Sequence, residues 1–138
     1  MASKVFINLP VKDLKKSIEF FTKLGFTFNP QFADDKATSM IISENIFVML
    51  LVEERFRDFT SKQLADASKV TEVIIAIDAE SRTSVDEMMD KVIDAGGQEH
   101  NATQDYGWMY VRSFTDINDH IWEVIYLDEA GLPDQQAG

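Results

Sequence analysis

The sequence contains no cysteine, and this absence excludes a disulfide framework, a thiol nucleophile and a thiolate metal site. Basic residues are also scarce: 13 Lys and Arg stand against 24 Asp and Glu, which gives a formal net charge of −11. Such an acidic surface repels phosphate backbones and no basic cluster offsets it, so the sequence argues against nucleic-acid binding. The charge is compatible with a solvated acidic surface and with an acidic pocket for a cationic ligand.

The sequence also has no apolar run that approaches the roughly 20 residues of a membrane-spanning helix. The segment after Met1 leads directly into a strand pattern and has no apolar signal-peptide core. These absences, together with the lack of cysteine, predict a cytoplasmic protein with no membrane partner. The chain contains no Ser/His/Asp set, no glycine-rich phosphate loop and no nucleotide-binding motif.

What the sequence does contain is one pattern that occurs twice. A strand is predicted at 5–11, and a helix begins after the N-cap Asp13 and ends at Gly25. The second copy has a strand at 72–78 and then a helix at 84–96. The spacing from the predicted cap to the terminal glycine is the same in both copies, which indicates a duplicated unit.

The cap of the second helix is predicted from a capping box. Ser84 is followed three residues later by Glu87, the spacing at which each side chain can bond the other residue's backbone amide. The apolar stripe of this helix follows directly. The sequence therefore predicts that the second helix begins at Ser84.

Each predicted helix is followed by a run of short strands. The segments are 26–32, 37–43 and 46–52 in the first half, and 97–101, 108–114 and 120–126 in the second. The expected fold is therefore α+β, with two βαβββ modules that form a curved mixed sheet around a cavity, helices outside. At 138 residues the chain is expected to be a single domain whose modules, 4–52 and 71–128, share a core.

The segment 53–70 joins the predicted modules and is long for a connector. Phe56 and Phe59 are spaced to form one helical turn. This turn is either a lid over the cavity or a linker whose two rings patch the core. The tail, 129–138, is expected to be frayed.

Two stretches of the sequence resemble a known superfamily. Residues 6–26, Phe-Ile-Asn-Leu-Pro-Val-Lys-Asp-Leu and onward, are similar to the opening of the vicinal oxygen chelate superfamily, which comprises glyoxalase I, bleomycin-resistance proteins and extradiol dioxygenases. Residues 116–123 resemble its closing strand, Asp-Pro-Asp-Gly-x-x-x-Glu, with Ile117 and Asp119 in place of Pro and Gly. The resemblance covers 4–127 and is narrower to a bacterial branch described as lactoylglutathione lyase-like.

The resemblance implies where a site would lie. In glyoxalase I-like members, four inward positions carry His, Gln or Glu and hold a divalent metal. The corresponding positions are Phe6, Leu50, Glu72 (or Val73, if the strand shifts by one residue) and Glu123. Because Phe and Leu coordinate nothing, a degenerate site without a metal or other cofactor is expected. The alternative is a divalent metal at Glu72 and Glu123 in a metal-dependent lactoylglutathione lyase-like or extradiol dioxygenase-like enzyme.

The alternation of side chains along a strand supports this placement. Phe6 and Asn8 share one face of the first strand. Glu123 shares a face of the last strand with Ile121 and Ile125, and it is a carboxylate in an otherwise apolar run. A charge in such surroundings requires a partner, a proton or water.

Three interpretations of these residues are open. In the first, a metal-free module of the bleomycin-resistance type binds a flat small molecule, neutral or cationic, against aromatic rings. In the second, Glu72 or Glu123 is the general base of an enzyme without a tightly bound metal. In the third, both glutamates are only buried hydrogen-bonding groups, with Tyr110, Arg112 or the backbone as partners.

The predicted catalytic residues are therefore Glu72 and Glu123. The predicted ligand-binding residues are an aromatic and polar set: Phe6, Asn8, Leu50, Trp108, Tyr110 and Arg112. A half-open sheet leaves an apolar concave surface that relatives close with a second copy, so a homodimer is expected.

Overall fold

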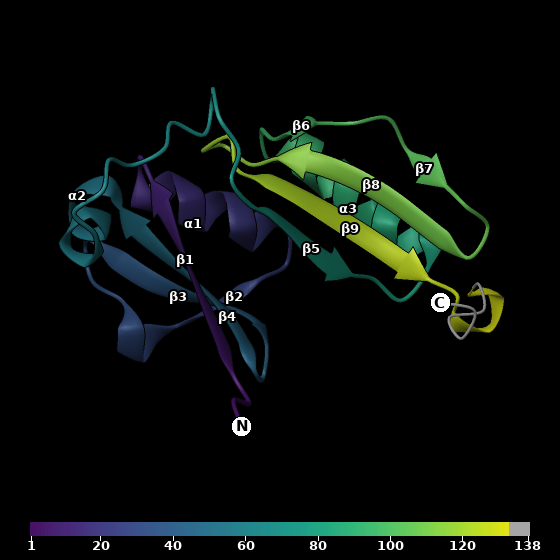
Figure 1. Ribbon diagram of the computed structural model, residues 1–138, viewed down its shortest axis with the longest axis horizontal. Helices are drawn as coiled ribbons and strands as arrows, with labels where there is room; N and C mark the ends of the chain where they lie inside the picture. The colour runs from purple at the N-terminus through teal and green to yellow at the C-terminus, as the bar shows by residue number, and fades with distance from the viewer. Residues whose placement is uncertain (133–138) are drawn as a thin grey trace. The chain divides into compact units, whose positions relative to one another are not determined.

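The computed structural model describes residues 1–132 and contains two compact units, Met1–Asp66 and a second that begins at Ala67 (Figure 1). The boundary lies within the predicted connector 53–70. In each unit a long helix lies on one face of a mixed sheet. The elements of the first unit follow the order βαβββ, and the second unit has the same order with one additional short strand. The α+β class and the duplicated module are thus confirmed. Among the described helices, none is both long and apolar enough to cross a membrane.

The first unit is a four-stranded sheet in the order β1-β4-β3-β2. Its elements are β1 (Val5–Val11), α1 (Leu14–Lys23), β2 (Thr27–Asn29), a 3-10 turn at Pro30–Phe32, β3 (Ala37–Ser43) and β4 (Ile46–Val52). β1 is parallel to β4, and the other neighbouring strands are antiparallel. Leu9, Val11, Val48 and Leu50 are buried on the side of the sheet that α1 covers (Figure 1).

Local signals explain the limits of α1. The Asp13 carboxylate accepts the backbone N–H of Lys16 at 3.0 Å, as an N-cap does. Gly25 ends the helix with a φ of +103°, a left-handed conformation that glycine adopts without steric cost. Between them, the buried rings of Phe20 and Phe21 contact each other edge to face, with centroids 5.0 Å apart. The predicted beginning and end of this helix are confirmed.

The second unit repeats the topology, with the strand order β5-β9-β8-β6. Its elements are β5 (Ile74–Asp78), α3 (Arg82–Asp94), β6 (Gln98–Glu99), β7 (Gln104–Asp105), β8 (Met109–Thr115), β9 (Ile121–Leu127) and a 3-10 turn at Glu129–Gly131. β5 is parallel to β9, and β9 is antiparallel to β8. The short β7, which the sequence did not predict, pairs with β8 beyond the end of β6.

The predicted cap of α3 is wrong by one turn. Ser81, not Ser84, is the N-cap, because the Ser81 hydroxyl accepts the backbone N–H of Ser84 at 3.0 Å. Ser84 lies inside the first turn, where its own hydroxyl is 3.0 Å from that of Ser81. As a result α3 has 13 residues and α1 has 10, so the equal spacing inferred from the sequence does not hold.

The turn between β8 and β9 is built around a buried carboxylate. Asp116 is only 3% exposed and accepts the backbone N–H groups of Asn118 and His120 and the indole N–H of Trp122. Burial raises the pKa of the Asp116 carboxyl above its ordinary value. Asp119 has a φ of +68°, in the left-handed region, which explains why the superfamily pattern has Gly at this position.

The connector contains α2 (Glu53–Phe56) and a 3-10 turn at Arg57–Phe59, so the predicted helical turn is present. The Phe59 ring is 65% exposed and lies under the Arg55 guanidinium, 5.2 Å from its carbon. It therefore does not patch a core, whereas the lid remains a prediction. Of the expected frayed tail, residues 133–138 lie outside the described part of the chain, and Glu129–Gly131 form a 3-10 turn.

Candidate functional site

Each sheet has a helix-free face, defined as the face opposite its long helix. In the first unit this face carries Phe6 and Asn8 of β1, which pair with Phe47 and Met49 of β4. Phe6 is 57% exposed, and its ring stacks on that of Phe47 with a centroid distance of 5.1 Å. The Lys4 ammonium lies 5.9 Å from the Phe47 centroid, within cation–π range. This face therefore presents two stacked aromatic rings with one lysine ammonium beside them.

Leu50 does not belong to this surface. The register pairs Leu50 with Leu9, and both side chains are buried on the side of α1. The prediction that Leu50 shares a face with Phe6 is therefore wrong by one residue. The residues of β4 that do share it are Phe47, Met49 and Leu51, and none of them has a nitrogen or oxygen to offer a metal.

In the second unit, Glu123 of β9 lies on the helix-free face, as predicted. Its register partners are Ala76 on β5 and Ser113 on β8, so three neighbouring strands place these side chains in one row. Ile121 and Ile125 flank Glu123 along β9. Glu123 is half-buried as a residue, and its carboxylate makes no hydrogen bond or ion pair with any group in residues 1–132.

Glu72 is not part of this row. It lies in a bend before β5, which begins at Ile74, and its side chain is exposed. The residues of β5 that share the face of Glu123 are Ile74, Ala76 and Asp78, of which Asp78 is exposed. Sequence reasoning missed Asp78, although its two-residue spacing from Ala76 could have identified it.

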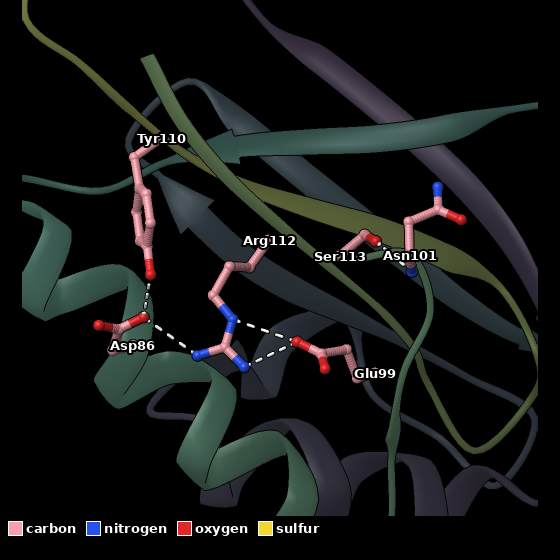
Figure 2. A network of polar contacts seen from close by, with 6 residues as sticks. All are labelled: Asp86, Glu99, Asn101, Tyr110, Arg112 and Ser113. Carbon is pink, nitrogen blue, oxygen red and sulfur yellow. Dashed lines mark hydrogen bonds and ion pairs between the residues drawn. The ribbon is translucent and has the colours of Figure 1, made fainter. Parts of the chain in front are cut away.

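Tyr110 and Arg112, predicted to bind ligand, lie on the other face of the second sheet, toward α3 (Figure 2). The Arg112 guanidinium donates to Asp86 of α3 at 3.0 Å and to Glu99 of β6 at 2.7 and 3.2 Å. The Tyr110 hydroxyl donates to the same Asp86 oxygen at 2.8 Å. This hydrogen bond, together with burial, raises the pKa of Tyr110. These residues tie α3 to the sheet, and neither is a partner of Glu123.

Trp108 lies just before β8, half-buried, and stacks on Tyr106 with centroids 6.3 Å apart. An ion pair and a hydrogen bond connect this segment to α3. Arg82, at the start of α3, donates to both carboxylate oxygens of Asp105 and to the Gly107 carbonyl. The hydrogen bonds from Arg82 and from the Gly107 amide lower the pKa of Asp105 to about 2.

The donor set does not fit the metal of glyoxalase I-like proteins. Three or four protein ligands are needed, and the helix-free faces offer two carboxylates, Glu123 and Asp78, on the second sheet. Among residues 1–132, no group of three or more His, Cys, Asp or Glu side chains is arranged to hold a metal ion. A metal-dependent mechanism therefore has no support in these residues.

Comparisons with known proteins agree with the architecture. The family described as Bleomycin resistance protein-like N-terminal matches residues 4–43. The hypothetical protein SA1046 from S. aureus is similar with a TM-score of 0.77 and 27% sequence identity, over 91% of this chain and 95% of that one. The comparison with curated proteins found no match.

Two more distant structures share the fold. A glyoxalase-related enzyme from Fulvimarina pelagi has a TM-score of 0.76 at 17% identity, over 91% of this chain and 88% of its own. The fosfomycin resistance protein FosX from Listeria monocytogenes has a TM-score of 0.66 at 19% identity, over 91% and 93%. The fold and the match over the first module confirm the resemblance of this chain to the vicinal oxygen chelate superfamily of glyoxalases, bleomycin-resistance proteins and dioxygenases.

Proposed function

We propose that the protein binds a small organic molecule without a tightly bound metal, in the manner of a bleomycin-resistance protein, and that Glu123 anchors the ligand. The observation that carries this proposal is the half-buried Glu123 carboxylate, which lacks a partner in residues 1–132. On the same face of β9, its nearest neighbours along the strand are Ile121 and Ile125. A carboxylate held among apolar side chains gains most from a partner that brings both a hydrogen-bond donor and an apolar body.

The charge of the chain favours the same class of ligand. A net charge of −11 draws cations toward the protein. We therefore assign the ligand to compounds that combine an apolar body with an amine or another N–H group.

The proposal is tested by calorimetric titration with benzylamine, the simplest aromatic cation of this kind. Glu123→Gln removes the charge and keeps the shape, and it should weaken binding by about tenfold or more, because hydrogen bonds to charged groups contribute about 1.5–3 kcal/mol. The matched control is Glu87→Gln, at an exposed glutamate of α3. Equal affinity in Glu123→Gln and wild type would contradict the proposal.

The proposal includes a homodimer. β1 and β5 are each the end strand of a sheet, and the apolar side chains Phe6 on β1 and Ile74 on β5 are more than half exposed. Unpaired strand edges with exposed apolar side chains tend to be covered by another chain. Light scattering should give twice the chain mass of 15.7 kDa, and a monomer at micromolar concentration would refute the dimer.

A further inference from the structure

The hydroxyl group of Ser113 lies beside Glu123 on the helix-free face of the second sheet. β8 and β9 are antiparallel, and their register places Ser113 directly opposite Glu123. Side chains that are paired in this way lie on the same face of the sheet. Ser113 is only 3% exposed, whereas Ala76, on the other side of Glu123, is exposed. The row thus has a closed end at Ser113 and an open end at Ala76.

The orientation of this hydroxyl is fixed by the chain that follows β6. The Asn101 backbone N–H donates to the Ser113 Oγ at 2.9 Å (Figure 2), and the His100 N–H donates to the Ser113 carbonyl at 2.9 Å. The Oγ is therefore an acceptor here, and a serine hydroxyl still has one proton to donate. Within residues 1–132, no group accepts that proton.

The neighbours of Ser113 on β8, in contrast, lie on the α3 side of the sheet and are fully engaged there. Arg112 is committed to Asp86 and Glu99, and Phe114 is fully buried on the side of α3, where it stacks on Trp122. Figure 2 shows the Arg112 side chain directed toward α3 and Ser113 directed toward Asn101. The Ser113 proton is thus separate from the network that fastens the helix.

We infer that Ser113 and Glu123 form a two-point recognition element, with the hydroxyl as donor and the carboxylate as acceptor. The ligand group that satisfies both has an acceptor and a donor side by side, as a primary carboxamide does. Glu123 takes the N–H of this group, and Ser113 donates to its carbonyl oxygen. This inference rests on the proposed function and deepens it, because it makes Ser113 the residue that separates carboxamides from simple amines.

The test compares two probes that share one ring. Benzamide carries both a donor and an acceptor, whereas benzylamine carries only donors. Ser113→Ala should weaken benzamide by about threefold to tenfold, the value of one hydrogen bond, and leave benzylamine unchanged. Thr115→Ala is the matched control, because Thr115 lies on the same face of β8, two residues away, opposite Ile121. It should change neither affinity.

A wild-type measurement keeps the test valid if Ser113→Ala does not fold. Because the Asn101 N–H bonds the Ser113 Oγ, its amide resonance should shift with benzamide and stay in place with benzylamine. Loss of affinity for both probes in Ser113→Ala, or an unmoved Asn101 resonance in the benzamide complex, would overturn the role of Ser113 while leaving Glu123 as the anchor. Failure of wild type to bind either probe would instead overturn the proposed function.

Discussion

The two faces of the second sheet differ in whether their polar groups have hydrogen-bond partners. On the side of α3, Arg112, Tyr110, Asp86 and Glu99 satisfy one another through hydrogen bonds of 2.7 to 3.2 Å. On the helix-free face, the Glu123 carboxylate and the Ser113 proton have no partner within residues 1–132. A satisfied network stabilises the fold, whereas unpaired groups of opposite hydrogen-bonding character suit a ligand. Mutations on the two faces should therefore separate stability from binding.

The largest effect is expected at Asp116, on the structural side of this comparison. Asp116→Ala leaves the Trp122 indole N–H and two backbone N–H groups without their acceptor. Unfolding measurements in urea should show a loss of about 3–5 kcal/mol, since each orphaned buried donor costs about 1–3 kcal/mol and some will meet water. Asp116→Asn keeps an acceptor and should lose less. An equal loss in both variants would show that the charge, not the acceptor, matters.

A smaller loss is expected at Arg112. Its side chain is 22% exposed, and Arg112→Met should cost about 1–2 kcal/mol of unfolding free energy, because solvent screens the ion pairs to Asp86 and Glu99. Its affinity for benzylamine should equal that of wild type, the reverse of Glu123→Gln. If Arg112→Met weakened the binding of benzylamine in a folded protein, the division between the faces would fail.

A change in the opposite direction is expected at Asp119. This residue has a φ of +68°, and glycine adopts that conformation without the steric cost that a side chain brings. Asp119→Gly should leave stability unchanged or raise it by up to about 1 kcal/mol. Asp119→Val, which is β-branched, should destabilise the turn. A clear loss in the glycine variant would assign the Asp119 carboxylate a role that its geometry does not show.

The smallest effect concerns acid stability. The pKa of Asp105 falls from 3.8 to about 2 in the folded chain, because Arg82 and the Gly107 amide bond the carboxylate. A depressed pKa stabilises the fold above the unfolded value of 3.8, and this contribution is lost as the pH falls toward 2. Asp105→Asn should therefore flatten the pH dependence of stability in that interval. If the pH dependence of stability were unchanged in Asp105→Asn, the ion pair between Arg82 and Asp105 would not persist in solution.

The sequence predicted the fold because its signals are local. The cap at Asp13, the stop at Gly25 and the alternation along β1 and β9 each depend on neighbouring residues only. The cap of α3 was misplaced because Ser81 and Ser84 both suit an N-cap, and the choice depends on how the chain leaves β5.

The site was harder to predict because faces and partners depend on pairing between strands. Leu50 was assigned to the wrong face because 46–52 contains no polar residue to mark the alternation. The alternation along β8 places Tyr110 and Arg112 on one face and Ser113 on the other, but the sequence does not say which of these faces packs against α3. The role of Ser113 depends on Asn101, a contact that exists only once β6 and β8 are paired.

The central claim is that ligand binds the helix-free face of the second sheet, and methyl resonances test it most directly. In a titration of wild type with benzylamine, the methyl groups of Ile121 and Ile125 should shift, because these side chains flank Glu123. The methyl groups of Val85, Val92 and Val124, which are buried on the α3 side, should stay in place. Shifts confined to the three valines would contradict the account.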